Sequence, residues 1–303
     1  MNPVDARSTF SGSQASKSVR KPNCKSPTAS IDYGVRPYLL TEGEFAHICK
    51  LIYGTCGIHL KEGKQDLVKA RLGRRLRTLG LQTFQDYVEL VESDGTGLEL
   101  AEMVDLLTTN KTEFFRDVAH FDLMRDVILP EHAGSNARLR FWCAGCSTGE
   151  EPYSVSMLVS DSLRDLSRRD FKILATDICR PALNQAAEGR FAVEELEGVP
   201  PAFRNRYFAG AEEGFVQVVP SLRKLIHFAR LNLMDPWPMK GPFQLVMCRN
   251  VMIYFDRGTR EKLVGRFWDL LAPGGYLMVG LSESLTGMRH SFKYVQPAVY
   301  LKA

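Results

Sequence analysis

The stretch "FWCAGCSTGEEPYS" (141–154) decides the fold, because it reads as the end of a buried strand, a tight loop and the start of a helix. Gly145 and Gly149 allow the backbone of the loop to approach a neighbour closely. Pro152 suits the first turn of a helix, where its missing N–H leaves no hydrogen bond unmade. In an open parallel sheet, ligands bind beside such strand-to-helix turns. This turn is therefore the first candidate for a binding site.

The strand before this turn is the apolar run "LRFWCAG" (139–145), and further runs of the same kind follow. They are "FKILATDI" (171–178), "LIHFARLNL" (225–233), "FQLVMCRN" (243–250) and "GYLMVGL" (275–281). Amphipathic helical patterns separate most of them, which favours an α/β fold with a parallel sheet and helices on both faces. The segment from about 190 to 224 has proline turns and an alternating "FVQVV". We expect a small antiparallel β insertion there.

The chain before the sheet has a different texture. Apolar residues recur at spacings of three and four, which predicts several short helices. The beginning of the chain is rich in serine and poor in large apolar residues, so little burial offsets the entropy of ordering it. The predicted parts are a disordered tail (1–37), an N-terminal all-helical domain (38–107), a linker helix (108–136) and a sheet domain (137–303) that contains the insertion.

Composition excludes several classes of protein. No apolar run approaches the roughly 18 to 20 residues that a membrane span needs. There is no apolar core of a secretory signal, and the seven cysteines are scattered through apolar segments, so we expect a cytoplasmic protein with reduced thiols. A net charge of +4 demands no nucleic-acid partner.

The C-x-x-C pair Cys143 and Cys146 is a weak metal or redox signal. Zinc needs four ligands, and neither a second C-x-x-C nor a pair of closely spaced histidines follows. We expect no metal.

The acidic residues of the opening stretch indicate what its loop binds. Glu150 and Glu151 at a helix N-terminus would repel a phosphate but suit an ammonium or sulfonium, and the loop lacks a phosphate-binding G-x-x-x-x-G-K-[ST] pattern. Asp177 ends the second predicted strand, where a carboxylate typically binds ribose hydroxyls. A ribose and a cation without phosphate describe S-adenosylmethionine.

Five motifs in order carry a resemblance to a known family. They are "LTTNKTEFFR" (107–116), "WCAGCSTGEEPYS" (142–154), "ATDI" (175–178), "LNL" (231–233) and "CRNVMIYFD" (248–256). Over about residues 38–303 the chain resembles CheR-type chemotaxis receptor methyltransferases. The resemblance implies a Rossmann-like S-adenosylmethionine-dependent methyltransferase sheet behind an all-helical domain.

The resemblance also implies a set of cofactor-binding residues. The segment that begins at 108 would close over the cofactor, Glu150 would meet the methionine ammonium and Asp177 the ribose, and Asn232 and Leu233 would flank the adenine. The full set is Asn110, Thr112, Arg116, Ala144, Glu150, Asp177, Asn232, Leu233, Arg249 and Asn250.

The reaction that the family performs is methyl transfer to glutamate side chains of membrane chemoreceptors, which forms methyl esters in chemotaxis adaptation. A carboxylate with a pKa near 4.3 is already ionised at neutral pH, so the reaction needs no general base. Arg116 and Tyr254 are the groups that we expect to orient it. Tyr254 as a core tyrosine behind the fourth strand is the alternative.

Receptor recognition is expected in the basic stretch 61–80. On a helical wheel Lys64, Arg71, Arg74 and Arg75 share one face, and the resemblance implies that this domain contacts the cytoplasmic helical region of the receptors. A merely solvated face is the alternative. The short loop "AGAEE" (209–213) argues against binding of a receptor C-terminal tether, and we expect a monomer.

Two other functions stay open at this point. One is a catalytically inactive, cofactor-binding regulator of a chemosensory-type system. The other is a nucleic-acid methyltransferase, which is disfavoured because no [DNS]-P-P-[YFW] motif follows the fourth strand. Which receptor and which glutamates are modified, and whether the pathway is chemotaxis or a related one, are not encoded in these motifs.

Overall fold

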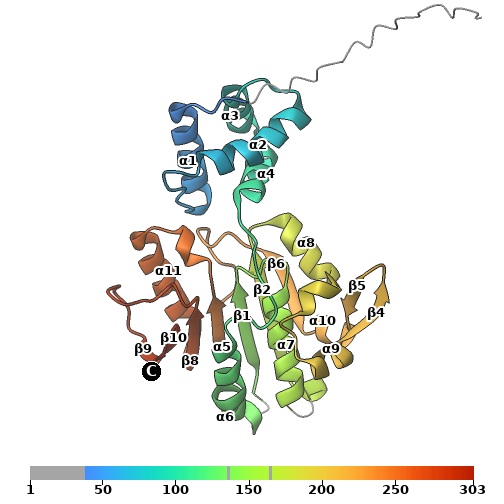
Figure 1. Ribbon diagram of the computed structural model, residues 1–303. Coiled ribbons are helices and arrows are strands. Elements are labelled where there is room, and N and C mark those ends of the chain that lie inside the picture. The colour runs from blue at the N-terminus through green and yellow to red at the C-terminus, as the bar shows by residue number, and fades with distance from the viewer. Residues whose placement is uncertain (1–37, 135–136, 164–165) are drawn as a thin grey trace, which may run out of the picture. The chain divides into compact units, whose positions relative to one another are not determined.

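The computed structural model describes residues 38–134, 137–163 and 166–303. The predicted disordered tail (1–37) lies outside these residues. Figure 1 shows a group of helices that precedes a twisted sheet flanked by helices. None of the helices in the described ranges combines the length and apolar character needed to cross a membrane.

The first group consists of four helices with a hydrophobic core of their own. Local sequence sets their ends: Thr41 and Thr83 each cap a helix in a capping box, and Gly57 and Gly80 end two helices in the left-handed conformation. The helices are α1 (Glu42–Cys56), α2 (Gln65–Leu79), α3 (Phe84–Ser93) and α4 (Leu98–Leu107). Their core includes the fully buried Ile48, Ile52, Leu72, Phe84 and Tyr87.

The main sheet has seven strands in the order β6-β2-β1-β7-β8-β10-β9. The parallel strands are β1 (Leu139–Ala144), β2 (Phe171–Asp177), β6 (Ile226–Arg230), β7 (Phe243–Cys248) and β8 (Leu271–Val279). All five correspond to predicted runs, although β8 begins earlier than its run. The antiparallel strands β9 (Lys293–Gln296) and β10 (Val299–Leu301) complete one edge and were not predicted.

The strand β1 is buried on both faces, as the sequence predicts. Phe141 and Cys143 belong to one hydrophobic cluster, which includes residues of α7 (Glu150–Ser162) and α8 (Arg180–Glu188). Trp142 and Ala144 belong to a second cluster with α11 (Arg257–Leu270). Because side chains alternate along a strand, this division confirms helices on both faces of the sheet.

The insertion is a three-stranded antiparallel sheet in the order β3-β5-β4, as expected. Its strands are β3 (Arg190–Ala192), β4 (Phe208–Glu212) and β5 (Phe215–Val218), and the short helices η3 (Val193–Leu196), α9 (Pro201–Tyr207) and α10 (Pro220–Arg223) accompany them. The prediction of a loop at 209–213 is wrong, because most of this segment belongs to β4. Only the tight turn at Glu213 and Gly214 joins β4 to β5.

The predicted linker helix is wrong in its first part. Residues 108–117, the connecting segment, are not helical, and the helical stretch begins only at Val118. It comprises α5 (Val118–Leu123), a π-helical turn η1 (Met124–Ile128) and α6 (Leu129–Ala133). The error has a physical cause: Phe114 and Phe115 are both buried, Phe114 against Phe191 and Phe115 against Phe121, so neighbouring residues pack in different directions.

Candidate functional site

A cavity of about 360 Å³ lies where four parallel strands end. This volume falls in the range of small-molecule and cofactor sites. The loops after β1, β2, β6 and β7 supply one part of the wall, and the connecting segment and the helical domain supply the rest. Its lining includes Cys56, Ile58, Lys64, Asn110, Thr112, Arg116, Gly145, Ser147, Glu151, Asp177, Leu231, Asn232, Leu233, Arg249, Asn250 and Tyr254.

The turn after β1 needs its glycines. Gly145 has φ of 91°, and a Cβ at this position would lie 2.3 Å from Cγ2 of Val251 in the loop after β7. Gly149, with φ of 102°, would place a Cβ 2.9 Å from that of Ala186 on α8. The turn therefore packs directly against the neighbouring elements, which keeps its backbone at the cavity wall.

Asp177 lies at the end of β2 and in the cavity wall, as predicted. Its two carboxylate oxygens accept hydrogen bonds from the backbone N–H groups of Ser147 at 2.8 Å and Cys179 at 2.9 Å. Burial raises the pKa of Asp177, and these two hydrogen bonds oppose the increase. The carboxylate is thus fixed in orientation before any ligand binds.

The two glutamates at the start of α7 differ from the prediction in their placement. Glu150 is buried and does not belong to the cavity lining, and the same holds for Ala144 at the end of β1. Both carboxylate oxygens of Glu150 accept hydrogen bonds from the Thr148 hydroxyl, at 2.9 and 2.7 Å. Burial raises the pKa of Glu150 from 4.5 to about 6. Glu151 lines the cavity instead, and it accepts a hydrogen bond from Arg249 at 3.0 Å.

Three predicted residues of the connecting segment meet at the cavity. Asn110 donates to Sγ of Cys179 at 3.0 Å, and its carbonyl accepts from the Ser147 hydroxyl at 2.8 Å. Thr112 and Arg116 also line the wall. The Arg116 guanidinium donates to the carbonyl of Lys111 and forms no ion pair with a carboxylate in the described part of the chain.

The loop after β6 brings Asn232 and Leu233 to the wall. The Asn232 amide donates to the carbonyl of Thr55 at 2.7 Å, and its oxygen accepts from the N–H of Met234. The amide therefore ties this loop to α1. Leu233 is the apolar member of the pair and is 8% exposed.

The loop after β7 carries Asn250 and Tyr254. Tyr254 is half-buried at the end of the single-turn helix η4 (Met252–Tyr254) and lines the cavity, which contradicts the alternative of a core tyrosine. Asn250 has φ of 59°. Both residues line the same cavity as Arg116.

Glu283 supports this loop, and the sequence analysis missed it. Its carboxylate is fully buried and accepts hydrogen bonds from the N–H groups of Asn250 at 2.7 Å, Ile253 at 3.0 Å and Gly280 at 2.6 Å. Burial raises the pKa of Glu283, and the hydrogen bonds oppose the increase. An acidic residue in the short loop after an apolar strand, four residues beyond its end, was the signal that could have identified it.

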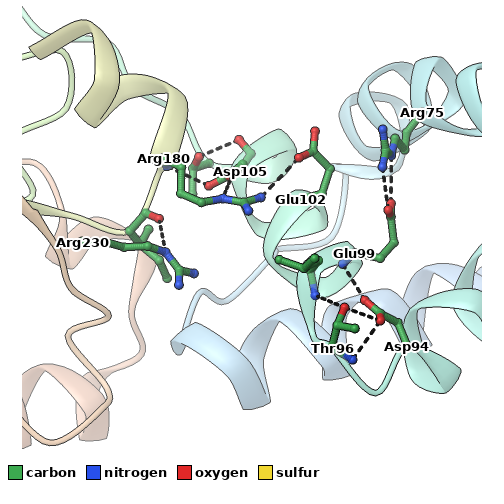
Figure 2. Close-up of polar contacts among 11 residues, drawn as sticks. Arg75, Asp94, Thr96, Glu99, Glu102, Asp105, Arg180 and Arg230 are labelled. Carbon is green, nitrogen blue, oxygen red and sulfur yellow. Dashed lines mark hydrogen bonds and ion pairs between the residues drawn. The ribbon is translucent and has the colours of Figure 1, made fainter. Parts of the chain in front are cut away.

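The predicted basic face of α2 is largely engaged within the protein. Arg75 forms two hydrogen bonds with Glu99 on α4, at 2.9 and 2.6 Å, as Figure 2 shows. Arg71 donates to the carbonyls of Leu106 and Thr108. Of the four predicted residues, Arg74 and Lys64 remain exposed, and Lys64 also lines the cavity.

Figure 2 also shows how α4 is joined to α8. Arg180, at the start of α8, donates through its backbone N–H and its Nε to Asp105 at 3.0 and 2.7 Å, and it pairs with Glu102 at 3.2 Å. The side chain of Asp105 is only 3% exposed. The helical domain is therefore fastened next to the loop that orients Asp177.

The cysteines of the opening stretch are core residues. Cys143 and Cys146 are both 1% exposed, and burial raises the pKa of each thiol well above its ordinary value. They are therefore protonated at neutral pH. Within the described residues, no group of three or more His, Cys, Asp or Glu side chains could hold a metal ion.

The fold and the cavity define the class of protein: an α/β domain with a cofactor-sized cavity beside the ends of its parallel strands. Two family models match the chain, the SAM-binding domain of CheR methyltransferases over residues 110–301 and their all-alpha domain over residues 43–108.

Named relatives agree with these matches. A probable chemotaxis protein methyltransferase of Rhizobium etli is 42% identical over 82% of this chain and 96% of its own length, and the chemotaxis protein methyltransferase of Escherichia coli is 40% identical over 86% and 91%. A solved structure of the glycopeptide N-methyltransferase MtfA with sinefungin covers 58% of this chain and 53% of its own, at 12% identity and a TM-score of 0.33, which is too low to add to the argument.

The chain belongs to the CheR methyltransferase family. It is an S-adenosylmethionine-dependent methyltransferase of the chemotaxis type.

Substitution of Gly145 by alanine tests the close packing of the turn after β1. The added Cβ would overlap Val251 in a left-handed backbone conformation. We expect the free energy of unfolding to fall by about 2 to 4 kcal/mol, with loss of cofactor affinity. Thermal or urea unfolding and calorimetric titration with S-adenosylhomocysteine measure the two effects.

Gly265→Ala is the matched control, because Gly265 is exposed on α11 and a Cβ there would have nothing within 4 Å. It should leave binding unchanged and stabilise the helix by up to about 1 kcal/mol. Equal behaviour of the two variants would contradict the packing argument.

Proposed function

We propose that this protein transfers the methyl group of S-adenosylmethionine to glutamate carboxylates of methyl-accepting chemoreceptors and so forms glutamate methyl esters. The observation that carries the proposal is that Arg116, whose guanidinium forms no ion pair within 4 Å among the described residues, and Tyr254 line the same cofactor-sized cavity. A guanidinium and a phenol are groups that receive an anionic acceptor. The names of the relatives, chemotaxis protein methyltransferases, support the same pathway.

The residues of the cavity fit the cofactor that the family implies. Asp177 offers a fixed carboxylate at the end of β2, where ribose hydroxyls are commonly bound. Leu233 offers an apolar surface for a flat base, and Gly145, packed against Val251, keeps the backbone of the turn at the cavity wall. Asn110, Thr112, Asn232 and Asn250 complete the proposed cofactor-binding set, and Ala144 and Glu150 directly precede the lining residues Gly145 and Glu151 in the sequence. Arg249 also lines the cavity, but Asp117 and Glu151 engage its guanidinium.

The chemistry requires alignment more than proton transfer. When bound, the cofactor supplies an electrophilic methyl group on a sulfonium. The acceptor carboxylate is ionised at neutral pH, so the protein has no proton to remove. Arg116 would hold the carboxylate by paired hydrogen bonds and Tyr254 would add one from its hydroxyl, which fixes the direction of attack. Such positioning is worth roughly 7 to 11 kcal/mol in favourable cases.

Other functions have less support. An inactive cofactor-binding regulator would not need Arg116 and Tyr254 beside the cavity. Methylation of a nucleobase amine is disfavoured because the chain reads "RNVMIYFD" after β7, where a [DNS]-P-P-[YFW] motif would be expected. Action on a protein carboxylate is therefore the proposal that best uses the groups present.

Receptor contact through α2 is part of this proposal, with a smaller surface than the sequence predicted. Arg71 and Arg75 have partners within the protein, so their contribution to a receptor surface would be indirect. Lys64 and Arg74 are the exposed members, and Lys64 lies at the cavity wall. An acidic receptor helix could meet these two without breaking an internal ion pair.

The type of bond formed is the first prediction to test. Receptor membranes incubated with the protein and methyl-labelled S-adenosylmethionine should acquire label that mild base releases as methanol, because esters hydrolyse under conditions that leave amines and ethers intact. Arg116→Ala and Tyr254→Phe should each lower turnover about tenfold or more, while cofactor affinity changes little. Base-stable label, or full turnover in both variants, would refute the proposal.

Charge reversal on α2 tests receptor contact. Lys64→Glu and Arg74→Glu should raise the KM for receptor several-fold and leave cofactor binding intact, because electrostatic attraction mainly affects encounter and orientation. High salt should reduce the difference in receptor KM between these variants and the wild type, because it screens the charges. Arg71→Glu is the contrasting variant, since it should lower stability through loss of its bonds to α4 and the connecting segment. If Lys64→Glu and Arg74→Glu methylate receptor normally, this face is only solvated.

The pH dependence of cofactor affinity distinguishes Glu150 from Glu151. An ammonium binds the ionised carboxylate, and the pKa of Glu150 is about 6. If Glu150 holds the ammonium, affinity should rise about tenfold per pH unit up to about pH 6 and level off above it. Glu150→Gln should lower affinity and remove this slope, as calorimetry between pH 5 and 8 would measure. An unchanged slope in Glu150→Gln, together with weaker binding by Glu151→Gln, would assign the contact to Glu151.

A further inference from the structure

Arg116 lies between two residues with unusual backbone conformations. Phe115 has φ of 54° and Asp117 has φ of 57°, and neither is a glycine. Left-handed conformations at such residues are strained, and they persist only where surrounding contacts hold them. The part of the connecting segment that carries Arg116 is therefore held in place by something other than its own preferences.

The contacts that hold it come from two elements. The N–H of Phe115 donates to the hydroxyl of Ser154 on α7 at 2.9 Å, in a buried position. The carbonyl of Arg116 accepts a hydrogen bond from the Arg249 guanidinium, and the carboxylate of Asp117 pairs with the same guanidinium at 2.8 Å. Both neighbours of the proposed acceptor-binding arginine, and its own backbone, are thus fixed.

Arg249 is engaged through its guanidinium by contacts within the protein. Its side chain is 2% exposed, and its other terminal nitrogen pairs with Glu151 at 3.0 Å. The ring of Phe121 lies 5.8 Å from the guanidinium carbon. His120, on the same helix as Phe121, has its pKa lowered to about 4, chiefly by burial and also by the charge of Arg249, so it is neutral at physiological pH. The charge of Arg249 is shared by the two carboxylates of Asp117 and Glu151.

We propose that Asp117 and the buried Arg249 form a latch, an ion pair that sets the position of Arg116, which makes Asp117 a positioning residue for methyl transfer. The inference rests on the proposed role of Arg116 in holding the acceptor carboxylate. It gives Arg249 a different task from the cofactor contact that the family resemblance implies, because its side chain acts through the backbone of Arg116.

The latch acts on one side of the cavity. Asp177 is oriented by Ser147 and Cys179, which are not part of the latch. Loss of the ion pair between Asp117 and Arg249 should therefore increase the conformational freedom of the Arg116 side chain. The part of the cavity wall around Asp177 should keep its conformation. Turnover should fall, and affinity for the cofactor should not.

The test is a double-mutant cycle with Asp117→Asn and Arg116→Ala in the full-length protein. Asparagine keeps the size of the side chain and tolerates the left-handed conformation, so Asp117→Asn removes mainly the charge. Asp117→Asn should lower turnover on receptor membranes about 10- to 100-fold, with the Kd of S-adenosylhomocysteine within about threefold of the wild type. In the Arg116→Ala background it should have no further effect, because a residue that acts through Arg116 has nothing left to position.

Asp122→Asn, on the adjoining helix α5, is the matched control, since the side chain of Asp122 is 47% exposed and pairs only with Arg125 among the described residues. Its turnover should equal that of the wild type. Effects of Asp117→Asn and Arg116→Ala that add, a loss of cofactor affinity that parallels the loss of turnover, or full activity of Asp117→Asn would each overturn the latch. Full activity of Arg116→Ala alone would instead refute the proposed role of Arg116.

Ser154→Ala keeps the proposal testable if Asp117→Asn does not fold. It releases Phe115 from α7 without changing any charge. Ser154→Ala should lower turnover less than Asp117→Asn does and leave the affinity for S-adenosylhomocysteine unchanged. In the Arg116→Ala background it should cause no further loss of turnover. A loss that persists in that background would show a general structural effect and overturn the latch.

Discussion

The buried carboxylate of Asp177 is the constraint on which the cavity depends. The parallel register sets Ala144 opposite Thr176, so the Thr176 carbonyl accepts from the N–H groups of Gly145 and Cys146, at 2.7 and 2.9 Å. Asp177 follows directly and fastens the loop after β1 to the loop after β2. A slip of one residue in this strand pair would turn Asp177 to the other face of the sheet and disconnect the two loops.

Much of the fold could be predicted because it depends on local pattern. Strands buried on both faces appear as continuous apolar runs, and the five parallel strands were found in this way. The prediction for the connecting segment failed because Phe114, Val118 and Phe121 recur at a helical spacing, whereas Phe114 packs against Phe191, which is distant in the sequence. The strands β9 and β10 were missed because they are short and pair antiparallel at an edge of the sheet.

Site residues could be predicted from the sequence where they directly follow a predicted strand. Gly145 and Asp177 stand at strand ends, and parallel strands bring such residues together. The pairing of Arg75 with Glu99, and the support that Glu283 gives to Asn250, join residues far apart in the sequence. A helical wheel gives the face of a side chain but not its partner, so Arg71 and Arg75 seemed available to a receptor when they were already engaged.

The shared wall of the cavity connects the hydrophobic core of α1–α4 with the two hydrophobic clusters of the sheet. The helices α1–α4 have a core separate from those of the sheet, yet residues of both line one cavity. A ligand that binds only when the helices and the sheet are both folded stabilises the fully folded protein relative to any state in which one of them is unfolded. At a hundredfold excess over its Kd this linkage is worth about 2.7 kcal/mol. The cofactor would therefore strengthen the coupling between the unfolding of α1–α4 and that of the sheet, and a change in its cellular supply would alter the lifetime of the protein as well as its rate of methyl transfer.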